Sequence, residues 1–466
     1  MSAATGTTTA HGAGGVAVVH PRRWAAAVVM MIAALMDLVD VTIVNVALPS
    51  IGQDLGASDS ALQWTVSAYL LGFAATLIVA GHLGDRYGRK AMFLAGTAGF
   101  GLASLACGVA QTPGQLIAAR AVQGVAAAVL MPQVLGSFHS LFREGRERGK
   151  VFGLYGAVAG FASALGLLLG GLLTDADLFG LGWRAVFLVN VPVAMLTLAA
   201  AVVLVPATRE RSAARPDVPG SLVLAGGLVA IVLPLVQGRE YDWPAWGWAL
   251  MGAGLLAIAA LARRGTLLPA RILRVRAFSL GLAVQLLFAL GMQGFFLVYA
   301  IWLQGRQGYA PLEAGVLMLA FSAGGFLTAP AADPLAERLG RIVPVAGAVA
   351  MAGGYGWVWV AMDGGAAVHT GAWPMVPGLV VAGAGLGLLV VPLVNIVLST
   401  APSELAGGAS GIFSTAQQFG GALGAAVVGT AFFSAGSVDD AMPWVVASYA
   451  AAALLALALP HRAPRP

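Results

Sequence analysis

The chain has 466 residues, of which 59% are hydrophobic and 10% are charged, with a formal net charge of +5 and a mean hydropathy of +0.87. A soluble domain is typically about 45–50% apolar and 25% charged, so this composition excludes both a set of water-soluble domains and a disordered chain. The single cysteine, Cys107, excludes a disulfide framework and a thiolate metal site. The class that remains is an all-α integral membrane protein.

A helix needs about 20 apolar residues to cross the hydrocarbon core of a bilayer. Charged breaks divide this chain into fourteen apolar stretches of suitable length. Residues 1–23, rich in Thr, Gly and Ala, are predicted to be a disordered cytoplasmic tail, and 460–466 a second one. The predicted spans are 24–48, 61–80, 91–110, 115–138, 151–173, 185–206, 219–238, 246–262, 277–303, 313–332, 343–362, 375–398, 409–433 and 443–459.

The positive charges agree with an even number of spans. If the N-terminus lies inside, the loops and tails on the cytoplasmic side hold 21 of the 25 Lys and Arg residues. Only Arg184, Arg239 and Arg306 then lie outside, and Arg120 lies within a span. Cytoplasmic loops are enriched in Lys and Arg, so the sequence predicts that both termini are cytoplasmic. Without the two weakest spans, 219–238 and 246–262, the count would be twelve.

A short motif recurs along the chain. The loop Leu83–Arg89 and the loop Leu335–Arg341 share an acid, two arginines and a glycine in register, 252 residues apart. Transporters are commonly built from such internal repeats, with the substrate site between them. This offset is longer than a unit of six spans by about the length of two further spans, which matches the pair between 219 and 262. The predicted domains are therefore a six-helix bundle at 24–206, a two-helix linker insert at 207–265 and a second six-helix bundle at 266–459.

Four strings in this order and on these sides of the membrane resemble the major facilitator superfamily. Gly81–Lys90 is similar to its loop motif between helices two and three, and Leu116–Gly124 to its fourth-helix motif. Asp40–Pro49 and Trp183–Pro192 look like strings of its fourteen-helix branch, the drug:proton antiporter family 2. The resemblance implies the major facilitator fold, alternating access and export of antibiotic-like compounds.

The fifth-helix antiporter motif of that family is only partly present. Gly166, Gly170 and Gly171 match it, but Leu167 stands where the family has Pro, and Ala162 where it often has Gly. Leu keeps the backbone donor that Pro lacks, so a Pro-dependent kink is not expected. The glycines still allow close contact between helices. The direction of transport is therefore less firmly indicated than membership of the family.

Buried charge indicates the coupling site. Only Asp37, Asp40 and Arg120 lie well inside predicted spans, where an ionisable group costs at least about 2.5–3.5 kcal/mol. Asp40 lies about 12 Å and Arg120 about 7–8 Å from the outer surface, at 1.5 Å per residue. The two side chains can therefore meet if helices one and four are adjacent, as the resemblance implies. Burial favours the neutral carboxyl and a guanidinium favours the carboxylate, so Asp40 is our predicted proton site. The alternative is a static ion pair. Asp37 is a second proton site, a cation anchor or a water-facing bystander.

The loop motif has two interpretations. The resemblance implies a charge latch that breaks and reforms as the two bundles move, whereas the positive-inside rule explains the same charges as topology signals. Asp85 is predicted at the start of helix three, where a carboxylate caps free amides. The predicted latch consists of Gly81, Gly84, Asp85, Arg86, Gly88 and Arg89, with the repeat residues Glu337, Arg338 and Arg341.

Amide side chains within spans are the candidates for the substrate cavity, with helix–helix hydrogen bonds as the alternative. Phe296 on helix nine is a candidate for an apolar wall, although ordinary packing explains it as well. Glu313 is predicted to cap helix ten. The amide candidates are Asn45, Gln123, Gln285, Gln293, Asn395, Gln417 and Gln418.

Enzyme chemistry is not indicated. The six histidines are scattered without metal-ligand spacing, no phosphate-binding loop is present, and the basic residues form no nucleic-acid patch. We therefore expect no metal or cofactor, and a monomer in the cell inner membrane that exchanges protons for small hydrophobic substrates. The alternatives are a proton-coupled symporter or uniporter of a small metabolite and a non-transporting membrane sensor or scaffold.

Overall fold

The computed structural model describes residues 22–142, 146–207, 217–265, 270–363, 371–400 and 406–460. The predicted N-terminal and C-terminal tails lie almost entirely outside these ranges. Within the described residues the chain forms helices and turns and no strand.

All fourteen predicted spans coincide with helices. The bounds are α1 (Arg23–Leu55), α2 (Asp59–Tyr87), α3 (Arg89–Gly108), α4 (Pro113–Leu141), α5 (Arg146–Asp175), α6 (Ala185–Leu188), α7 (Asn190–Leu204), α8 (Val218–Gln237), α9 (Ala245–Arg264), α10 (Ala270–Leu273), α11 (Arg276–Ala300), α12 (Pro311–Leu339), α13 (Ile342–Asp363), α15 (Val376–Ser399), α16 (Ala406–Ala435) and α17 (Val438–Ala456). The predicted sixth span consists of the short α6 followed by α7, and the ninth of α11 followed by a π-helical turn at Ile301–Arg306.

Eleven helices in the described part of the chain are long and apolar enough to cross a membrane. This is therefore a multi-pass membrane protein.

Local sequence sets several helix ends. The Ser58 and Thr112 side chains accept from backbone N–H groups in the first turns of α2 and α4. Glu313 accepts a 2.9 Å hydrogen bond from the Ala310 N–H at the start of α12, which confirms its predicted capping role.

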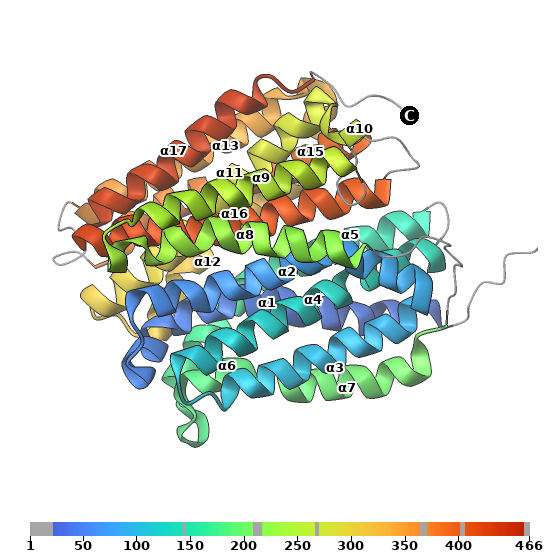
Figure 1. The fold of residues 1–466 in the computed structure, drawn as a ribbon, viewed down its shortest axis with the longest axis horizontal. Coiled ribbons are helices and arrows are strands. Elements are labelled where there is room, and N and C mark those ends of the chain that lie inside the picture. The colour runs from blue at the N-terminus through green and yellow to red at the C-terminus, as the bar shows by residue number, and fades with distance from the viewer. Residues whose placement is uncertain are drawn as a thin grey trace, which may run out of the picture.

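The long helices run roughly side by side, with the early helices at one edge and the late ones at the other (Figure 1). Among the early helices, α4 packs on α2 and α3, and α5 packs on α1. Among the late ones, α15 packs on α12 and α13, and α11 packs on α16 and α17. The two groups meet where α2 packs on α16 and α5 on α12. The domain boundaries at 206 and 266 stay predictions.

Helices α8 and α9 form a hairpin at the seam between the two groups. α8 contacts α2 and α16, whereas α9 packs mainly on α8 (Figure 1). Few residues of α9 are buried, namely Gly247, Gly254 and Leu261. The predicted linker insert is thus a pair of helices whose first member touches helices from both groups.

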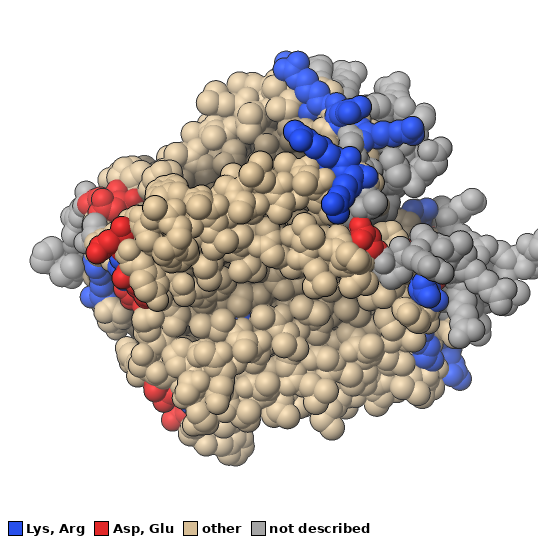
Figure 2. All heavy atoms as spheres, viewed as in Figure 1, with Lys and Arg blue, Asp and Glu red and all other residues tan. Residues whose placement is uncertain are grey.

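Charges divide between the two ends of the molecule. We call the end with the α1–α2 and α8–α9 turns the α1–α2 end, and the end with the turn around Gly88 the α2–α3 end. In the view of Figure 2, Lys and Arg gather at the α2–α3 end, and acidic side chains predominate at the other. The long flanks between them are almost uncharged in this view, as a surface facing lipid requires.

Glycine allows the close helix contacts around the site. A Cβ atom on Gly124 of α4 would lie 2.0 Å from the Tyr69 carbonyl oxygen of α2, and one on Gly72 would lie 2.5 Å from the Ala121 carbonyl oxygen. Neither position can carry a larger residue without moving a helix apart. The α2–α4 contact places Tyr69 directly beside Arg120.

Candidate functional site: a buried carboxylate–guanidinium network

Asp40 and Arg120 form a buried ion pair. Arg120 Nη1 lies 2.5 Å from Asp40 Oδ2, joining α4 to α1, and the two side chains are 2% and 0% exposed. An unpaired charge at this depth would be strongly destabilising, so each group depends on the other for its position. The structure thus brings together the two residues whose depths along their helices suggested that they could meet.

Two amides complete the coordination of Asp40. Its Oδ1 accepts hydrogen bonds of 2.8 Å from Gln123 Nε2 on α4 and from Asn190 Nδ2 on α7. Gln123 also donates to Ser104 Oγ on α3, at 2.9 Å. Gln123 was a cavity candidate, and the structure places it in the charge network instead. Helices α1, α3, α4 and α7 therefore all contribute to holding one carboxylate.

The Arg120 guanidinium is held on several sides. Its Nε donates to the Thr65 carbonyl oxygen at 3.2 Å, and its Nη1 donates to Gln123 Oε1 at 2.7 Å. Its Cζ lies 4.3 Å from the ring centroid of Tyr69 and 5.7 Å from that of Phe187. Cation–π contacts of this kind are worth about 2 kcal/mol or more when desolvated. A guanidinium so placed has favourable contacts besides Asp40.

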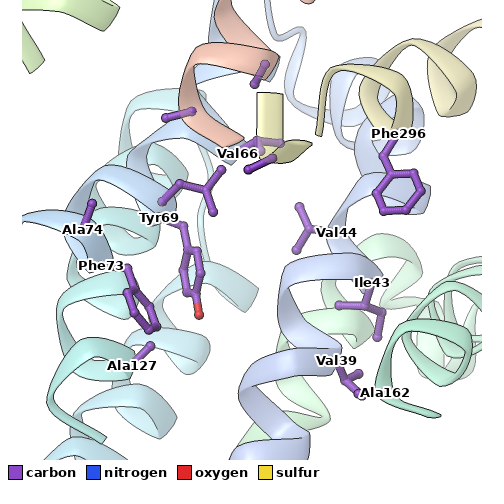
Figure 3. Packing of buried hydrophobic residues seen from close by; sticks show 14 of the residues in the cluster. Val39, Ile43, Val44, Val66, Tyr69, Phe73, Ala74, Ala127, Ala162 and Phe296 are labelled. Atoms are coloured by element: carbon purple, nitrogen blue, oxygen red, sulfur yellow. The ribbon is translucent and has the colours of Figure 1, made fainter. Parts of the chain in front are cut away.

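Asp37 lies one turn earlier on α1 and belongs to the same cluster. It is 3% exposed and accepts a hydrogen bond from the Tyr69 hydroxyl. No ion pair joins it to any residue that the structure describes. Tyr69 projects from α2 between α2 and α1, beside Phe73 and Ala127 (Figure 3). Tyr69 therefore contacts Asp37 through its hydroxyl and Arg120 through its ring.

The glycines of the fifth helix lie directly behind the acidic helix. A Cβ atom on Gly166 would lie 1.9 Å from Thr42 Oγ1, and one on Gly170 would lie 2.7 Å from the Ile43 carbonyl oxygen. A Cβ atom on Gly171 would instead lie 2.6 Å from the Pro311 carbonyl oxygen at the start of α12. Ala162 lies beside Val39 (Figure 3). The partial antiporter motif thus sets how closely α5 approaches α1 and α12.

The loop motif differs from the prediction in one respect. Helix α2 continues through Asp85 to Tyr87, so Asp85 lies in the last turn of α2, and its predicted place at the start of the third helix is wrong. Gly84 permits the continuation, because it packs on Gln133, whose Oε1 would lie 1.9 Å from a Cβ atom there. The chain turns only at Gly88, with φ of 96°.

The loop charges contact the first group of helices. Arg89 Nη2 lies 3.5 Å from Asp85 Oδ1, and Arg89 also donates to the Gly136 carbonyl oxygen of α4. The Arg86 guanidinium lies over the ring of Tyr87, and a Cβ atom on Gly81 would meet nothing within 4 Å.

In the repeat of this motif, Arg341 donates to the Leu459 carbonyl oxygen at 2.8 Å, while Glu337 and Arg338 are exposed.

The cavity candidates lie at several places. Asn45 Oδ1 accepts from Gln293 Nε2 at 2.9 Å, which joins α1 to α11. Gln285 is buried, and its Oε1 has no hydrogen-bond partner among the described residues. Asn395 is exposed and donates to Asp333 Oδ1 at 2.7 Å, toward the α2–α3 end. Gln417 and Gln418 are half-buried, and Phe296 packs edge-on against Phe321.

Among the participants that were not predicted from the sequence are three polar side chains. Asn190 and Tyr69 contact the carboxylates, and Ser104 contacts Gln123. Asn190 belongs to the Trp183–Pro192 string and is an amide within the predicted span 185–206, the same signal that singled out Asn45. Tyr69 and Ser104 carry no such signal, because neither is unusual within a membrane helix.

Comparison with known proteins identifies the family of this chain. Residues 30–425 match the model of the Major Facilitator Superfamily. The chain belongs to the Major Facilitator Superfamily. This superfamily member is a membrane transporter rather than an enzyme, as the sequence predicted.

Several curated relatives are similar over most of their length. A probable actinorhodin transporter of Streptomyces coelicolor is 40% identical, over 90% of this chain and 75% of its own. A puromycin resistance protein of Streptomyces alboniger is 38% identical, over 88% and 82%. A tetracenomycin C resistance and export protein of Streptomyces glaucescens is 34% identical, over 91% and 78%.

Solved structures show the same fold at low identity. A nucleoside transporter aligns with a TM-score of 0.66 at 12% identity, over 94% of this chain and 98% of its own. The inward open xylose transporter of E. coli aligns with a TM-score of 0.66 at 15% identity, over 93% and 96%. This likeness supports the predicted major facilitator fold.

Proposed function

We propose that this transporter exports small hydrophobic compounds of the antibiotic type in exchange for protons, by alternating access. The relatives named above are described as a probable actinorhodin transporter, a puromycin resistance protein, and a tetracenomycin C resistance and export protein. Transport against a gradient requires an energy source, and one proton is worth about 2.3 kcal/mol per 100 mV of membrane potential. The chain must therefore contain a group that binds and releases a proton.

The observation that carries this proposal is the fully buried Asp40 paired with Arg120. When Asp40 is ionised, the pair is electrically balanced and Oδ1 holds donors from α4 and α7. When Asp40 takes up a proton, the ionic attraction is lost and one carboxyl oxygen becomes a donor. Arg120 then retains the Thr65 carbonyl, Gln123 and the rings of Tyr69 and Phe187. Protonation therefore changes contacts on three helices at once, α1, α4 and α7.

Asp37 is, in this proposal, a second carboxyl that responds to the first. Its hydrogen-bond partner is the Tyr69 hydroxyl, and it forms no ion pair with a described residue. Because the Tyr69 ring lies on the Arg120 guanidinium, a change at either carboxyl alters the position of the same tyrosine. The two acids are thus linked through Tyr69.

The substrate path in this proposal lies between the two groups of helices. Asn45 and Gln293 meet there, and Asn45 is little more than one turn beyond Asp40 on α1. A substrate that breaks the Asn45–Gln293 bond would move α1 relative to α11. Substrate binding and proton binding would then act on the same helix.

The orientation and oligomeric state are part of the proposal. The positive-inside rule and the distribution in Figure 2 support a cytoplasmic α2–α3 end, so that both termini face the cytoplasm of a cell whose inner membrane holds the protein. The α1–α2 end would then face outward. We propose that the transport unit is a monomer, because every member of the charge network comes from one chain.

Proteoliposomes that contain a pH-sensitive dye in their lumen, prepared with an acidic interior, test the exchange. Adding substrate outside is expected to make the lumen alkaline, because substrate enters as protons leave. Asp40→Asn should abolish this signal, whereas Asp439→Asn, a change at an exposed acid at the start of α17, should not.

Other outcomes contradict proton exchange. A symporter would acidify the lumen, and a uniporter would leave its pH unchanged. These two alternatives follow from Leu167, which stands where the family has proline. A full signal with Asp40→Asn would show that another group carries the proton.

A further inference from the structure

One guanidinium outside the charge network contacts helices of both groups. Arg239 follows α8 in the turn before α9, and its Nη2 lies 2.8 Å from Asp59 Oδ2 in the first turn of α2. Its Nη1 donates to the Phe433 carbonyl oxygen near the end of α16. Asp59 belongs to the first six-helix group and Phe433 to the second, so Arg239 joins the two at the α1–α2 end.

Neighbouring contacts strengthen the same junction. The Glu240 carboxylate accepts a hydrogen bond from the Ser60 hydroxyl on α2, and Thr430 of α16 donates to the Leu235 carbonyl oxygen of α8 at 2.8 Å. Next to Thr430 in α16, a Cβ atom on Gly429 would lie 2.6 Å from Gln63 Nε2 of α2. The hairpin thus holds α2 on one side and α16 on the other, where these two helices also touch.

The contact with Phe433 satisfies a group that a helix cannot satisfy itself. The last four carbonyl groups of a helix have no partner within it, and Phe433 is one of them in α16. A cation at this position also interacts favourably with the helix dipole. If α2 and α16 separated here, Arg239 could follow only one of them. Either the Asp59 carboxylate or the α16 carbonyl would then lose its partner.

Other contacts show that the two groups are closed against each other at this end. Gln304, in the turn after α11, donates to the Val46 carbonyl oxygen of α1 at 2.9 Å. Gly171 near the end of α5 packs on Pro311 and Leu312 of α12. Alternating access requires that these contacts open in another conformer.

We propose that the α8–α9 hairpin acts as a clamp that stabilises the conformer closed at the α1–α2 end, with Arg239 as its principal residue. The clamp presupposes the alternating access proposed above and assigns a role to the two helices that lie outside the six-helix groups. Its partner is not a ligand but the seam between α2 and α16. Loss of Arg239 should therefore shift the equilibrium toward the conformer open at this end.

Arg184 provides a matched control at the same end of the molecule. Its Nη1 lies 2.7 Å from Asp54 Oδ2, and the side chains of that pair are 22% and 47% exposed, against 33% and 43% for Arg239 and Asp59. Arg184 also donates to a backbone carbonyl, that of Ala110. All of its partners lie in the first group of helices. Breaking this pair removes a comparable surface contact without affecting the seam.

The clamp can be tested by measuring a distance between spin labels with pulsed electron paramagnetic resonance. Val109 after α3 and Asp440 at the start of α17 are exposed residues at the α1–α2 end, one in each group of helices. Both are replaced by cysteine for labelling in a Cys107→Ser background, since Cys107 is the only native cysteine. Measurements use the purified full chain without substrate at one pH.

Arg239→Gln should raise the ratio of the long-distance to the short-distance population about fivefold or more, and Arg184→Gln should leave it unchanged. Asp59→Asn and Thr430→Val should shift it in the same direction, and they supply the test if Arg239→Gln does not fold. Unchanged distances in these variants, or an equal shift in Arg184→Gln, would overturn the clamp. The distance measurement does not depend on protons or substrate. The clamp can therefore fail while proton exchange in proteoliposomes is confirmed, and proton exchange can fail while the clamp is confirmed.

Discussion

Asn190 at the start of α7 donates a 2.8 Å hydrogen bond to Asp40 in the middle of α1, although 150 residues separate them. This amide and Gln123 both bind the oxygen of Asp40 that does not face Arg120. The carboxylate is therefore held by one cation and two neutral donors, which come from α4 and α7.

The ion pair gives the first stability prediction. Arg120→Gln should lower the free energy of unfolding by about 3–5 kcal/mol, because it leaves the Asp40 carboxylate buried without a cation. The double variant Asp40→Asn with Arg120→Gln should lose less than the sum of the two single changes. Unfolding of the purified protein in detergent measures all three. Strictly additive losses would mean that the two side chains do not interact.

Close packing of α5 on α1 gives a second prediction. Gly166→Ala should separate the helices and lower both stability, by about 1–3 kcal/mol, and transport, because a Cβ atom there would lie 1.9 Å from Thr42 Oγ1. Gly156→Ala on the same helix is the control. Its Cβ would meet nothing within 4 Å, so the change should be neutral or stabilise the helix by up to about 1 kcal/mol. Equal effects of the two alanines would contradict the packing argument.

The two amide side chains of α11, Gln285 and Gln293, differ in their hydrogen-bond partners. Gln293→Leu should destabilise the protein by about 1–3 kcal/mol, because Asn45 Oδ1 would lose its donor in a buried position. Gln285→Leu removes a buried amide whose oxygen has no described partner, so it should be neutral or stabilising. Thermal unfolding of the two variants compares them directly. The reverse order of stability would refute this assignment of the hydrogen bonds.

The loop motif predicts different roles for its two arginines. Arg89→Gln should lower the transport rate about tenfold, a loss of about 1.4 kcal/mol, because Arg89 joins Asp85 to the Gly136 carbonyl of α4. Arg86→Gln should change the rate less than about twofold, since Arg86 lies over Tyr87 at the surface and has no ion pair with a described residue. Substrate uptake in proteoliposomes at matched protein density measures both. Equal effects of the two changes would favour a topology signal over a latch, because each change removes one positive charge from this loop.

Much of this architecture was predictable because it follows from local composition. A stretch of about 20 apolar residues forms a helix in a membrane whatever its neighbours are, since its backbone has no other partner there. Each predicted span accordingly coincides with a helix. The position of Asp85 was wrong because a helix end depends on packing. Helix α2 continues past the predicted break, and Gly84 leaves room there for the Gln133 side chain.

The partners of the site residues could not be predicted in the same way. The sequence singled out Asp40 and Arg120 because charge is rare and costly within spans. Nothing in the sequence shows which amide contacts which partner. In the structure, Gln123 hydrogen-bonds to Asp40, Asn45 to Gln293 and Asn395 to Asp333. Which amide reaches which acid depends on the rotation of each helix about its axis. A span of mostly Ala, Leu, Val and Gly leaves that rotation open.

The sequence by itself determined the class of protein, the apolar segments that form helices and the two residues at the centre of the charge network. Hydrophobicity and charge are properties of each segment alone, so no contact between segments is needed to read them. Only the tertiary structure decided that Asn190 and Tyr69 join the two carboxyls, and that Arg239 lies between α2 and α16. These contacts join residues far apart in the chain, and they depend on how closely and at what rotation the helices pack.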